Sequence, residues 1–197
     1  MSISSAYHTL PTYQGFNHLG AESTESPSTE QLNTFVQALN ENGHLPYTVC
    51  LEQVRRAPYV QIIHDYQGNF IAGSTIKCCD GEVAEIGFML VDKKYRQLGL
   101  AERMTKDRIS YARKLGIKML YAKVRGKNIK SMNNLRKAGF QSSGDYLSQK
   151  DLYSTVSWFY LSLGLMSDTD CQQRLRKNWA NLVPVIGQVM MLDSADF

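Results

Sequence analysis

One stretch of the chain, EIGFMLVDKKYRQLGLAERM at positions 85–104, limits the possible folds more than any other. It begins as an apolar run of strand type, breaks into two lysines, a tyrosine and an arginine, and continues as a helical pattern after Gly99. A loop that leaves a strand and enters a helix through glycine presents backbone N–H groups without intrahelical partners. Together with the helix dipole, those groups form a site for phosphate. The stretch therefore predicts a strand–turn–helix unit that binds an anionic ligand.

The segments before and after this turn predict further strands and helices. Three runs rich in β-branched and aromatic residues, PYVQIIHDY, FIAGSTIKC and VAEIGFMLV, are separated by the turns QGN and CDGE, which is typical of a meander of β-hairpins. After the turn, apolar residues at helical spacing predict a helix from about Leu100 to Leu115. A strand at KMLYAKV, a helix at IKSMNNLRKAGF and a late aromatic strand at YSTVSWFYLSLG are expected to follow.

The N-terminal part predicts two helices in front of these strands. The pattern TEQLNTFVQALNENG places apolar residues three and four apart, with Ser28 or Thr29 as the N-cap and Gly43 as the stop. A second, short helix is expected around Tyr47 to Arg56. The residues before the first helix are expected to be loop-like, with one strand around Tyr7 to Tyr13.

The C-terminal part predicts one more helix. TDCQ forms a capping box at Thr169 and Gln172, and apolar residues follow on one side as far as Val189. Pro184 is expected to kink or divide this helix. The helix either closes over the domain's own sheet or forms a homodimer contact, and closure is favoured because it is the commoner use of a terminal amphipathic helix.

Length and composition favour one domain with an appendage. With 197 residues and 43% hydrophobic residues, the chain can form one sizeable core but is short for two full domains. We therefore expect a domain over residues 1–166 and a C-terminal helical extension over residues 167–197. No apolar run approaches about 20 residues, and the first residues have neither a basic leader nor an apolar segment. The expectation is a soluble, cytoplasmic protein without a membrane partner.

Cysteines and histidines give no sign of a metal site. The four cysteines include no CxxC pair and have no histidine at metal-ligand spacing beside them. The four histidines are scattered singly along the chain. Neither a metal nor a disulfide framework is therefore expected.

Basic residues are concentrated in the middle of the chain. Positions 81–140 hold fifteen Lys/Arg and five Asp/Glu, a net charge of +10, whereas the other positions have a net charge of −6. Such a segment is typical of a protein that meets a polyanionic ligand or partner. The alternative interpretation is a solvated helix face.

The turn resembles the acetyl-CoA signature of the GNAT acetyltransferase superfamily, R/QxxGxG/A. Arg96, Gly99 and Ala101 occupy its fixed positions, with a predicted strand before them and a predicted helix after them. The resemblance is good over positions 59–140 and extends more weakly to 29–58 and 141–164.

A second element of the same family supports this resemblance. The family has an asparagine, a small residue three positions later, and then the pair GF, and this chain has Asn128, Ser131, Gly139 and Phe140. The resemblance implies an α+β fold in α/β/α layers, with a mixed, mostly antiparallel central sheet flanked by helices.

The resemblance also implies a binding mode for acetyl-CoA as co-substrate. Its pyrophosphate would lie on the backbone amides of the turn, and its pantetheine arm would run beside the strand like a short extra strand. That strand must therefore separate from its neighbour. The implied contacts are Met89, Val91, Arg96, Gln97, Leu98, Gly99, Leu100, Ala101, Asn128 and Ser131.

Glu85 is the candidate general base. Acetyl transfer to an amine needs a group that removes the amine proton. Glu85 lies eleven positions before Arg96, as the base does in some family members, and strand alternation places it on the face of Gly87 and Met89. In an apolar cleft its pKa would rise toward neutrality. The alternative is a half-exposed glutamate that pairs with a lysine.

The usual general acid is missing. Family members place a tyrosine four residues before the GF glycine, and this chain has Leu135 there. Another tyrosine (Tyr121, Tyr153 or Tyr160), a water molecule, or loss of catalysis are the three alternatives.

The leading hypothesis is an N-acetyltransferase that acts on a primary amine of a small molecule or peptide by direct attack. One alternative is a catalytically degenerate GNAT fold that binds acyl-CoA or a protein. Another is an acetyltransferase that acts on aminoacyl-tRNA or a ribosomal protein, but nucleic acid is not favoured because the phosphates of CoA already account for much of the basic character. Polyamine, antibiotic, amino acid, peptide N-terminus and lysine side chain stay open as acceptors, which we expect to be selected by the first helices and by loops over Gln141 to Tyr153.

Overall fold

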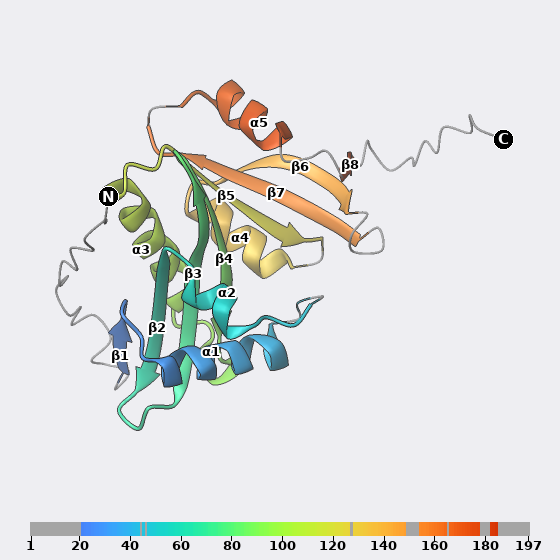
Figure 1. The fold of residues 1–197 in the computed structure, drawn as a ribbon. Helices are drawn as coiled ribbons and strands as arrows, with labels where there is room; N and C mark the ends of the chain where they lie inside the picture. The colour runs from blue at the N-terminus through green and yellow to red at the C-terminus, as the bar shows by residue number, and fades with distance from the viewer. Residues whose placement is uncertain are drawn as a thin grey trace.

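The computed structural model describes residues 21–43, 45, 47–126, 128–148, 154–164, 166–177 and 182–184. These residues form an eight-stranded sheet with helices on both of its faces (Figure 1). The strands are β1 (Ala21–Thr24), β2 (Tyr59–Asp65), β3 (Phe70–Asp80), β4 (Val83–Val91), β5 (Met119–Arg125), β6 (Gln141–Ser148), β7 (Ser154–Ser162) and β8 (Leu182–Pro184). The helices are α1 (Thr29–Asn42), α2 (Leu51–Arg55), α3 (Leu100–Lys114), α4 (Ile129–Lys137) and α5 (Asp168–Lys177).

The strand order is β1-β2-β3-β4-β5-β7-β6-β8. Strands β1 to β4 form an antiparallel meander, and β5, β7, β6 and β8 also pair in an antiparallel sense. Between these two halves, β4 and β5 run parallel, so the chain needs a crossover, which α3 supplies. The expected α+β fold with a mixed, mostly antiparallel sheet between helices is confirmed.

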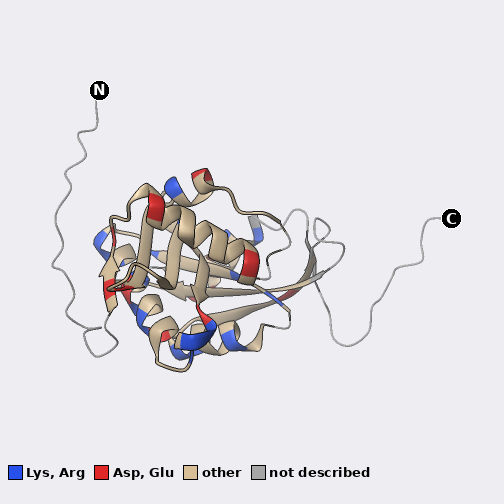
Figure 2. Ribbon diagram, turned by 90° about the horizontal axis from the view of Figure 1, so that it is seen from below, with Lys and Arg blue, Asp and Glu red and all other residues tan. Residues whose placement is uncertain are grey.

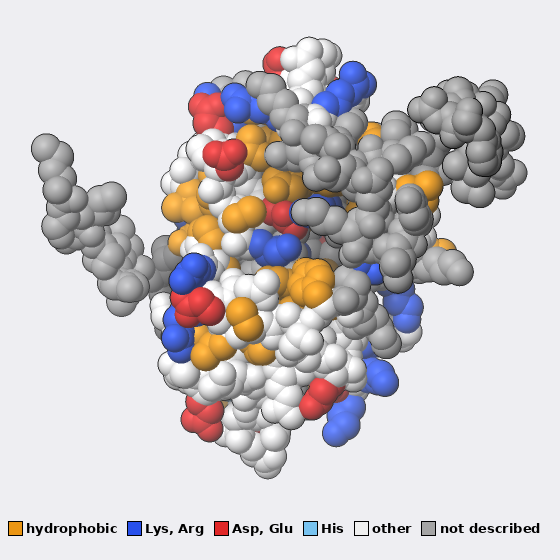
Figure 3. Space-filling view, turned by 45° about the vertical axis from the view of Figure 1, so that its right-hand side comes forward, with side chains coloured by type: hydrophobic (Ala, Val, Ile, Leu, Met, Phe, Trp, Pro, Cys, Tyr) orange, Lys and Arg blue, Asp and Glu red, His pale blue; other side chains and the backbone are white. Residues whose placement is uncertain are grey.

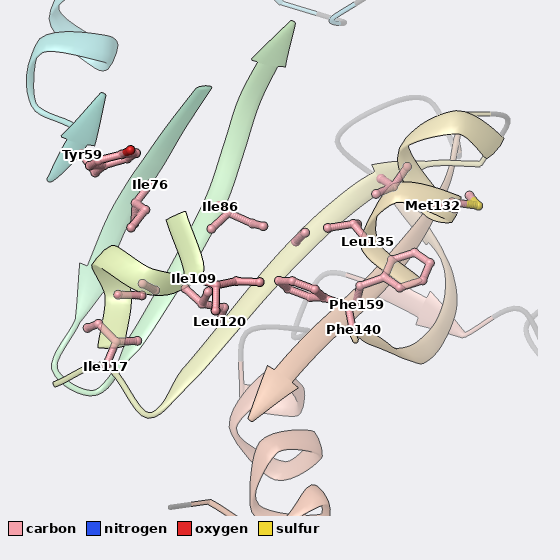
Figure 4. Close-up of a cluster of buried hydrophobic side chains, with 14 residues drawn as sticks. Tyr59, Ile76, Ile86, Ile109, Ile117, Leu120, Met132, Leu135, Phe140 and Phe159 are labelled. Carbon is pink, nitrogen blue, oxygen red and sulfur yellow. The ribbon is translucent and has the colours of Figure 1, made fainter. Parts of the chain in front are cut away.

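Helices α3 and α4 cover one face of the sheet (Figure 4). Ile86 of β4 and Leu120 of β5 are buried there against Ile109 of α3 and Leu135 of α4. The apolar residues of α3 recur at helical spacing, as the sequence predicts, because one side of the helix lies on the sheet. This face is therefore closed by packed side chains.

The opposite face is covered at its two ends. Phe35 of α1 is fully buried against Gly73 of β3, where a Cβ atom would lie 2.6 Å from its ring. Val54 of the short helix α2 belongs to the same cluster. Farther along the sheet, Cys171 and Leu175 of α5 pack on side chains of β5 and β7. The middle of this face, over β4 and β5, lies between the two covers.

Most local elements agree with the sequence predictions. Helix α1 begins after Ser28, whose Oγ accepts a hydrogen bond from the Gln31 N–H at 3.2 Å, and the Gln31 Oε1 accepts one from the Ser28 N–H at 2.8 Å. The helix ends at Gly43. The three strands of the meander, the crossover helix and the late strand also form as expected.

Three predictions at the edges of the sheet are wrong. Gln141–Ser148 is a strand rather than a loop, because β6 pairs along its length with β7. Ala21–Thr24, expected to be loop, pairs with β2. Leu182–Pro184, expected to be helical, pairs with β6. The expected strand around Tyr7 to Tyr13 lies outside the described residues.

Helix α5 forms where a helix was expected, but its N-cap lies two residues before the predicted one. The Ser167 Oγ accepts a hydrogen bond from the Asp170 N–H at 3.2 Å, so Ser167 and not Thr169 caps the helix. Residues 178–181 and 185–197 lie outside the described part, and the division at residue 167 stays a prediction. Within the described part, no helix has the length and hydropathy that crossing a membrane requires.

We expect Ser28→Ala to lower the free energy of unfolding by about 1 kcal/mol, because the first turn of α1 loses its capping acceptor. Urea denaturation measures this change. Ser26→Ala, two residues earlier at an exposed position, is the control and should leave stability unchanged. Equal stability of the Ser28 variant and the wild type would contradict this role of the capping box.

Candidate functional site

The parallel strands β4 and β5 separate in the middle of the sheet. They pair over three residues of each strand, and the last pair is Glu85 with Tyr121. β4 continues to Val91 and β5 to Arg125, but beyond this pair they no longer pair with each other, so the two strands diverge (Figure 4). Past Glu85, the described strands therefore give the backbone of β4 no partner on its β5 side. A ligand with amide groups can add to such an edge as an extra strand does.

A bulge in β4 lies beside this opening. The register with β3 jumps from Thr75–Gly87 to Gly73–Leu90, so two residues of β4 lie opposite one residue of β3. Phe88 has φ +43°, which is uncommon for a residue with a side chain. The bulge turns the backbone groups of Phe88 and Met89 out of the regular ladder.

The bulge also reverses the expected direction of one side chain. Gly87 faces the same side as Glu85, because a Cβ atom there would collide with the side chain of Lys77, which binds Glu85. Met89 instead contacts Thr105 and Arg108 of α3, on the opposite face. The prediction that Met89 shares the face of Glu85 is wrong, because strict alternation does not hold across a bulge.

The turn between β4 and α3 has the positive-φ backbone conformation that its glycine favours. Gly99 is the N-cap of α3 with φ +76°, and Gln97 also has a positive φ of +67°. The Arg103 N–H donates to the Gly99 carbonyl, so the N–H groups of the three residues before Arg103 have no intrahelical acceptor. Positions 96–99 are exposed. This group of donors lies just past the end of β4.

Arg96 is held at this turn. Its Nε–H donates to the Val91 carbonyl at 3.1 Å. The guanidinium group is therefore anchored to the last residue of β4 and adds a positive charge near the free amides of α3. The structure places the predicted residues from Val91 to Ala101 around one turn, in which positions 96–99 are exposed and Leu100 is buried in the core.

Helix α4 is hydrogen-bonded to the first turns of α3. The Asn134 side chain donates to the Thr105 Oγ1 at 2.8 Å and to the Ala101 carbonyl at 3.5 Å. Asn128 is the N-cap of α4, and its Oδ1 accepts a hydrogen bond from the Ser131 N–H at 3.1 Å. Ligand contacts by Asn128 and Ser131 stay predictions, while their role in starting α4 is visible.

Glu85 is buried and binds two lysines. The exposed fraction of its side chain is 8%. Its Oε1 lies 2.9 Å from the Lys77 Nζ of β3, and its Oε2 lies 2.8 Å from the Lys123 Nζ of β5. Tyr121 of β5 also donates its hydroxyl to Oε2 at 3.1 Å. Both carboxylate oxygens therefore have partners from the strands on either side.

The two lysines determine the acidity of this carboxyl group. Burial by itself raises the pKa of Glu85, but the nearby charges of Lys123 and Lys77 outweigh burial and hold the pKa below its ordinary value. The prediction of a pKa raised toward neutrality is therefore wrong. A half-exposed glutamate was the alternative, and that is wrong too, although its pairing with lysine is confirmed.

Tyr121 lies where the strands part. Its ring stacks on Trp158 of β7 with the centroids 5.7 Å apart. Burial, followed by the negative charge of Glu85, raises the pKa of the Tyr121 hydroxyl above its ordinary value, so the hydroxyl carries its proton at neutral pH. It can donate a hydrogen bond and, in a reaction, a proton.

A hollow opens over these residues on the face between α2 and α5. It has a volume of about 220 Å³ and is lined by Tyr47, Gln53, Lys77, Cys78, Glu85 and Phe88. Figure 3 shows basic and acidic side chains next to one another among hydrophobic ones on this side of the molecule. Glu85 is thus reached from the face of the sheet that α3 and α4 do not cover.

The other tyrosines considered as acids are not placed with Glu85. The Tyr160 hydroxyl donates to the Gln141 Oε1 at 3.1 Å, and its residue is buried beside α5. Tyr153 lies outside the described residues. Leu135 is 4% exposed and belongs to the core between α4 and the sheet, so it has a packing role.

A buried polar network on the α3 face was missed at the sequence level. Arg108 is 1% exposed and donates to the Thr105 Oγ1 at 3.0 Å and to the Thr75 carbonyl at 3.4 Å. Thr75 in turn donates its hydroxyl to the Gly87 carbonyl at 3.0 Å. The network therefore supports β4 just before its bulge. Helical spacing from Ala101 and Thr105 would have placed Arg108 on the buried side of α3.

Some of the basic residues of the middle segment form ion pairs with acidic residues of the same segment. Lys106 binds Glu102, Lys118 binds Glu82, and Arg103 binds Asp107. Figure 2 shows Lys and Arg positions interspersed with Asp and Glu positions. Among the described residues, no group of three or more His, Cys, Asp or Glu is arranged to hold a metal ion. The acidic members of these pairs are already counted in the net charge of +10, so the excess positive charge lies on other basic residues of the segment.

Comparison with known proteins agrees with this geometry. The sequence model of the acetyltransferase (GNAT) family matches residues 22–140. No curated protein matches the sequence.

Several solved structures have the same fold as this chain. An N-acetyltransferase from Staphylococcus aureus Mu50 has a TM-score of 0.61 and 16% identity, over 73% of this chain and 98% of its own. Spermidine N-acetyltransferase from Vibrio cholerae, in complex with CoA and spermine, has a TM-score of 0.58 and 16% identity, over 73% and 96%. The NatC complex bound to Gag peptide and CoA has a TM-score of 0.64 and 14% identity, over 73% and 98%.

We expect Glu85→Gln to lower the free energy of unfolding at pH 7 by about 2 kcal/mol, less than the ~3–5 typical of breaking a fully buried pair, because both lysines can reach water. The pKa of Glu85 is lowered in the folded state, so its ionised form stabilises the fold at neutral pH. That stabilisation is lost as the pH falls below about 4.3 and through the folded-state pKa.

Urea denaturation between pH 7 and the acid limit of folding measures this difference. The wild type should lose its advantage over Glu85→Gln as the pH falls. Glu82→Gln, which removes an exposed partner of Lys118, should have a much smaller effect throughout. A difference between Glu85→Gln and wild type that grows at acid pH would contradict the lowered pKa.

Proposed function

Because this chain belongs to the acetyltransferase (GNAT) family, we propose that it is an N-acetyltransferase that transfers the acetyl group of acetyl-CoA to a primary amine by direct attack. The observation that carries the proposal is the opening between β4 and β5. It has a group of free backbone amides at its outer end and the Glu85–Tyr121 pair at its inner end. The opening thus connects a site suited to binding phosphate with two groups that can transfer protons.

The outer end is proposed to hold the phosphates of acetyl-CoA. The backbone N–H groups from Gln97 to Ala101 and the charge of Arg96 suit a pyrophosphate. The exposed backbone of β4 from Met89 to Val91 suits the amide groups of the pantetheine arm, which would extend the sheet in the place where β5 has turned away. The thioester would then lie near the point where the strands separate.

The inner end is proposed to carry out the proton transfers. The amine nitrogen attacks the thioester carbon, and the C–S bond breaks as the amide forms. Glu85, ionised at neutral pH, takes the proton that the nitrogen loses. Tyr121 gives its proton to the departing thiolate, and the phenolate regains a proton from Glu85 through their hydrogen bond. The net products are the N-acetylated amine and CoA with a free thiol.

The low pKa of Glu85 affects when the proton moves. A carboxylate of this kind is too weak a base to deprotonate a free ammonium efficiently. Once the amine has attacked, its nitrogen is positively charged and much more acidic, so Glu85 can accept the proton at that stage. Glu85 must also exchange one of its lysine contacts for this proton, because both of its oxygens are already bound.

A binding module without turnover is the second candidate. Leu135 stands where the family usually has its acid and is buried in the core, and Glu85 is held by two lysines. CoA binding without acetylation of any amine would favour this candidate over the enzyme.

We expect Arg96→Glu, and separately Gly99→Val, to weaken CoA binding by at least about 10-fold, the effect of losing one charge-assisted hydrogen bond or more. Arg96→Glu repels phosphate, and valine at position 99 opposes the positive φ of the N-cap. Isothermal titration measures the affinity. Lys114→Glu, an exposed charge reversal at the other end of α3, should bind CoA as the wild type does. Unchanged affinity in both turn variants would contradict the phosphate site.

We expect Tyr121→Phe and Glu85→Gln each to lower kcat by about 100-fold or more, as loss of a positioned acid or base does. The affinity for CoA should change little, because neither side chain belongs to the turn. Steady-state assay of thiol release, with isothermal titration beside it, separates the two effects. Tyr160→Phe removes the hydroxyl of the tyrosine that pairs with Tyr121 across β5 and β7 and should retain activity. Full activity of Tyr121→Phe over the pH profile would rule out its role as acid.

A further inference from the structure

We propose that the acceptor is an amine that carries a negatively charged group, such as a carboxylate, close to its nitrogen, and that Lys77 and Lys123 select it. This inference rests on the proposed function and names its substrate class. The observation behind it is the charge of the cluster that Lys77 and Glu85 of the hollow form with Lys123 beside it, which is positive rather than negative.

The balance of charges follows from the contacts. One carboxylate faces two ammonium groups, at 2.9 Å for Lys77 and 2.8 Å for Lys123. The negative charge of Glu85 is therefore fully compensated, and one positive charge is left over. The lysine side chains are 24% and 38% exposed, whereas that of Glu85 is 8% exposed. An incoming ligand thus meets the ammonium groups before it meets the carboxylate.

Both lysines are fixed in place by more than Glu85. The Lys77 Nζ lies 4.8 Å from the centroid of the Phe88 ring, and the Lys123 Nζ lies 5.4 Å from that of Trp158. Aromatic faces attract ammonium groups, so both charges stay at the hollow when a ligand competes for them. They come from β3 and β5, on either side of β4, and so stand on both sides of the attack site.

The other groups around the hollow do not offset this charge. Tyr47, Gln53 and Cys78 contribute neutral side chains, and Phe88 contributes an apolar one. A polyamine would bring a second or third ammonium group into a site that already has an excess positive charge, and like charges repel strongly where water is excluded. The volume of about 220 Å³ suits a small group such as the head of an amino acid rather than a bulky acceptor.

An anionic group on the acceptor would also allow Glu85 to act as the base. A carboxylate that binds the Lys77 ammonium group takes over its contact with Glu85 and leaves the Glu85 Oε1 free to receive the amine proton, while Oε2 keeps its partners Lys123 and Tyr121. The same contact that selects the acceptor thereby releases the carboxylate for catalysis. An acceptor without a negative charge would leave both oxygens of Glu85 occupied.

The test compares matched acceptors that differ by one charge. Release of CoA thiol from acetyl-CoA is measured with L-amino acids, each beside its C-terminal amide, with phosphoethanolamine beside ethanolamine, and with spermidine. We expect kcat/KM to be at least 10-fold higher for the anionic member of a pair, and spermidine to be the poorest substrate. Preference for amides, ethanolamine or spermidine would overturn the inference while supporting the proposed function. CoA binding without turnover of any amine would overturn both.

Lysine variants test the cause of the preference. Lys77→Gln and Lys123→Gln each keep a hydrogen-bond donor for Glu85 but remove one positive charge. Both should reduce the ratio of kcat/KM between anionic and neutral members several-fold. Lys118→Gln, whose partner is Glu82 just before the start of β4, is the matched control and should keep the wild-type ratio. A ratio that stays unchanged in both Lys77→Gln and Lys123→Gln would rule out selection by these lysines.

Discussion

The early end of the pairing between β4 and β5 is the constraint on which the site depends. Parallel strands form an uninterrupted ladder when both are regular, yet this ladder stops at Glu85 and Tyr121. The bulge at Phe88 bends β4, and the buried Arg108 network supports β4 from the α3 side. The backbone of β4 past Glu85 is thereby left without a strand partner on its β5 side, in the middle of the described sheet. The core between the sheet and the helices stays closed beneath it.

The charged cluster around Glu85 combines stability with chemistry. A carboxylate buried in a sheet is costly unless it is paired, and the lysines of the two neighbouring strands provide that pairing. The same lysines lower the pKa of Glu85 and leave the three-residue cluster beside the hollow with a net positive charge. Stability, base strength and the choice of acceptor therefore depend on one set of contacts. Substituting any member of the set is expected to alter all three.

The local elements could be predicted from the sequence, whereas the contacts of the site could not. Gly99 and the apolar run before it indicated the turn, and Ser28 indicated the start of α1, because both signals are local. The meeting of Lys77 and Lys123 on Glu85 depends on strand register across three strands, which no spacing along the chain reveals. Gly87, directly before the bulge at Phe88, is a local sign of it, because an isolated glycine inside a strand pattern suggests a bulge. The β6 segment QSSGDYLS is polar, and its pairing with β7 is set by tertiary contacts rather than by alternation.

A nitrogen–proton NMR titration of the wild-type protein with acetyl-CoA tests the central claim most directly. The account predicts that the largest shifts occur at two groups of backbone amides, those of the bulge and end of β4 at residues 88–91 and those of the turn at residues 97–101. The amides of β6, which β5 and β7 separate from β4 in the strand order, should stay unchanged. Shifts that leave out both groups, or no shifts at saturating acetyl-CoA, would contradict the claim that the parted strands form the cofactor site.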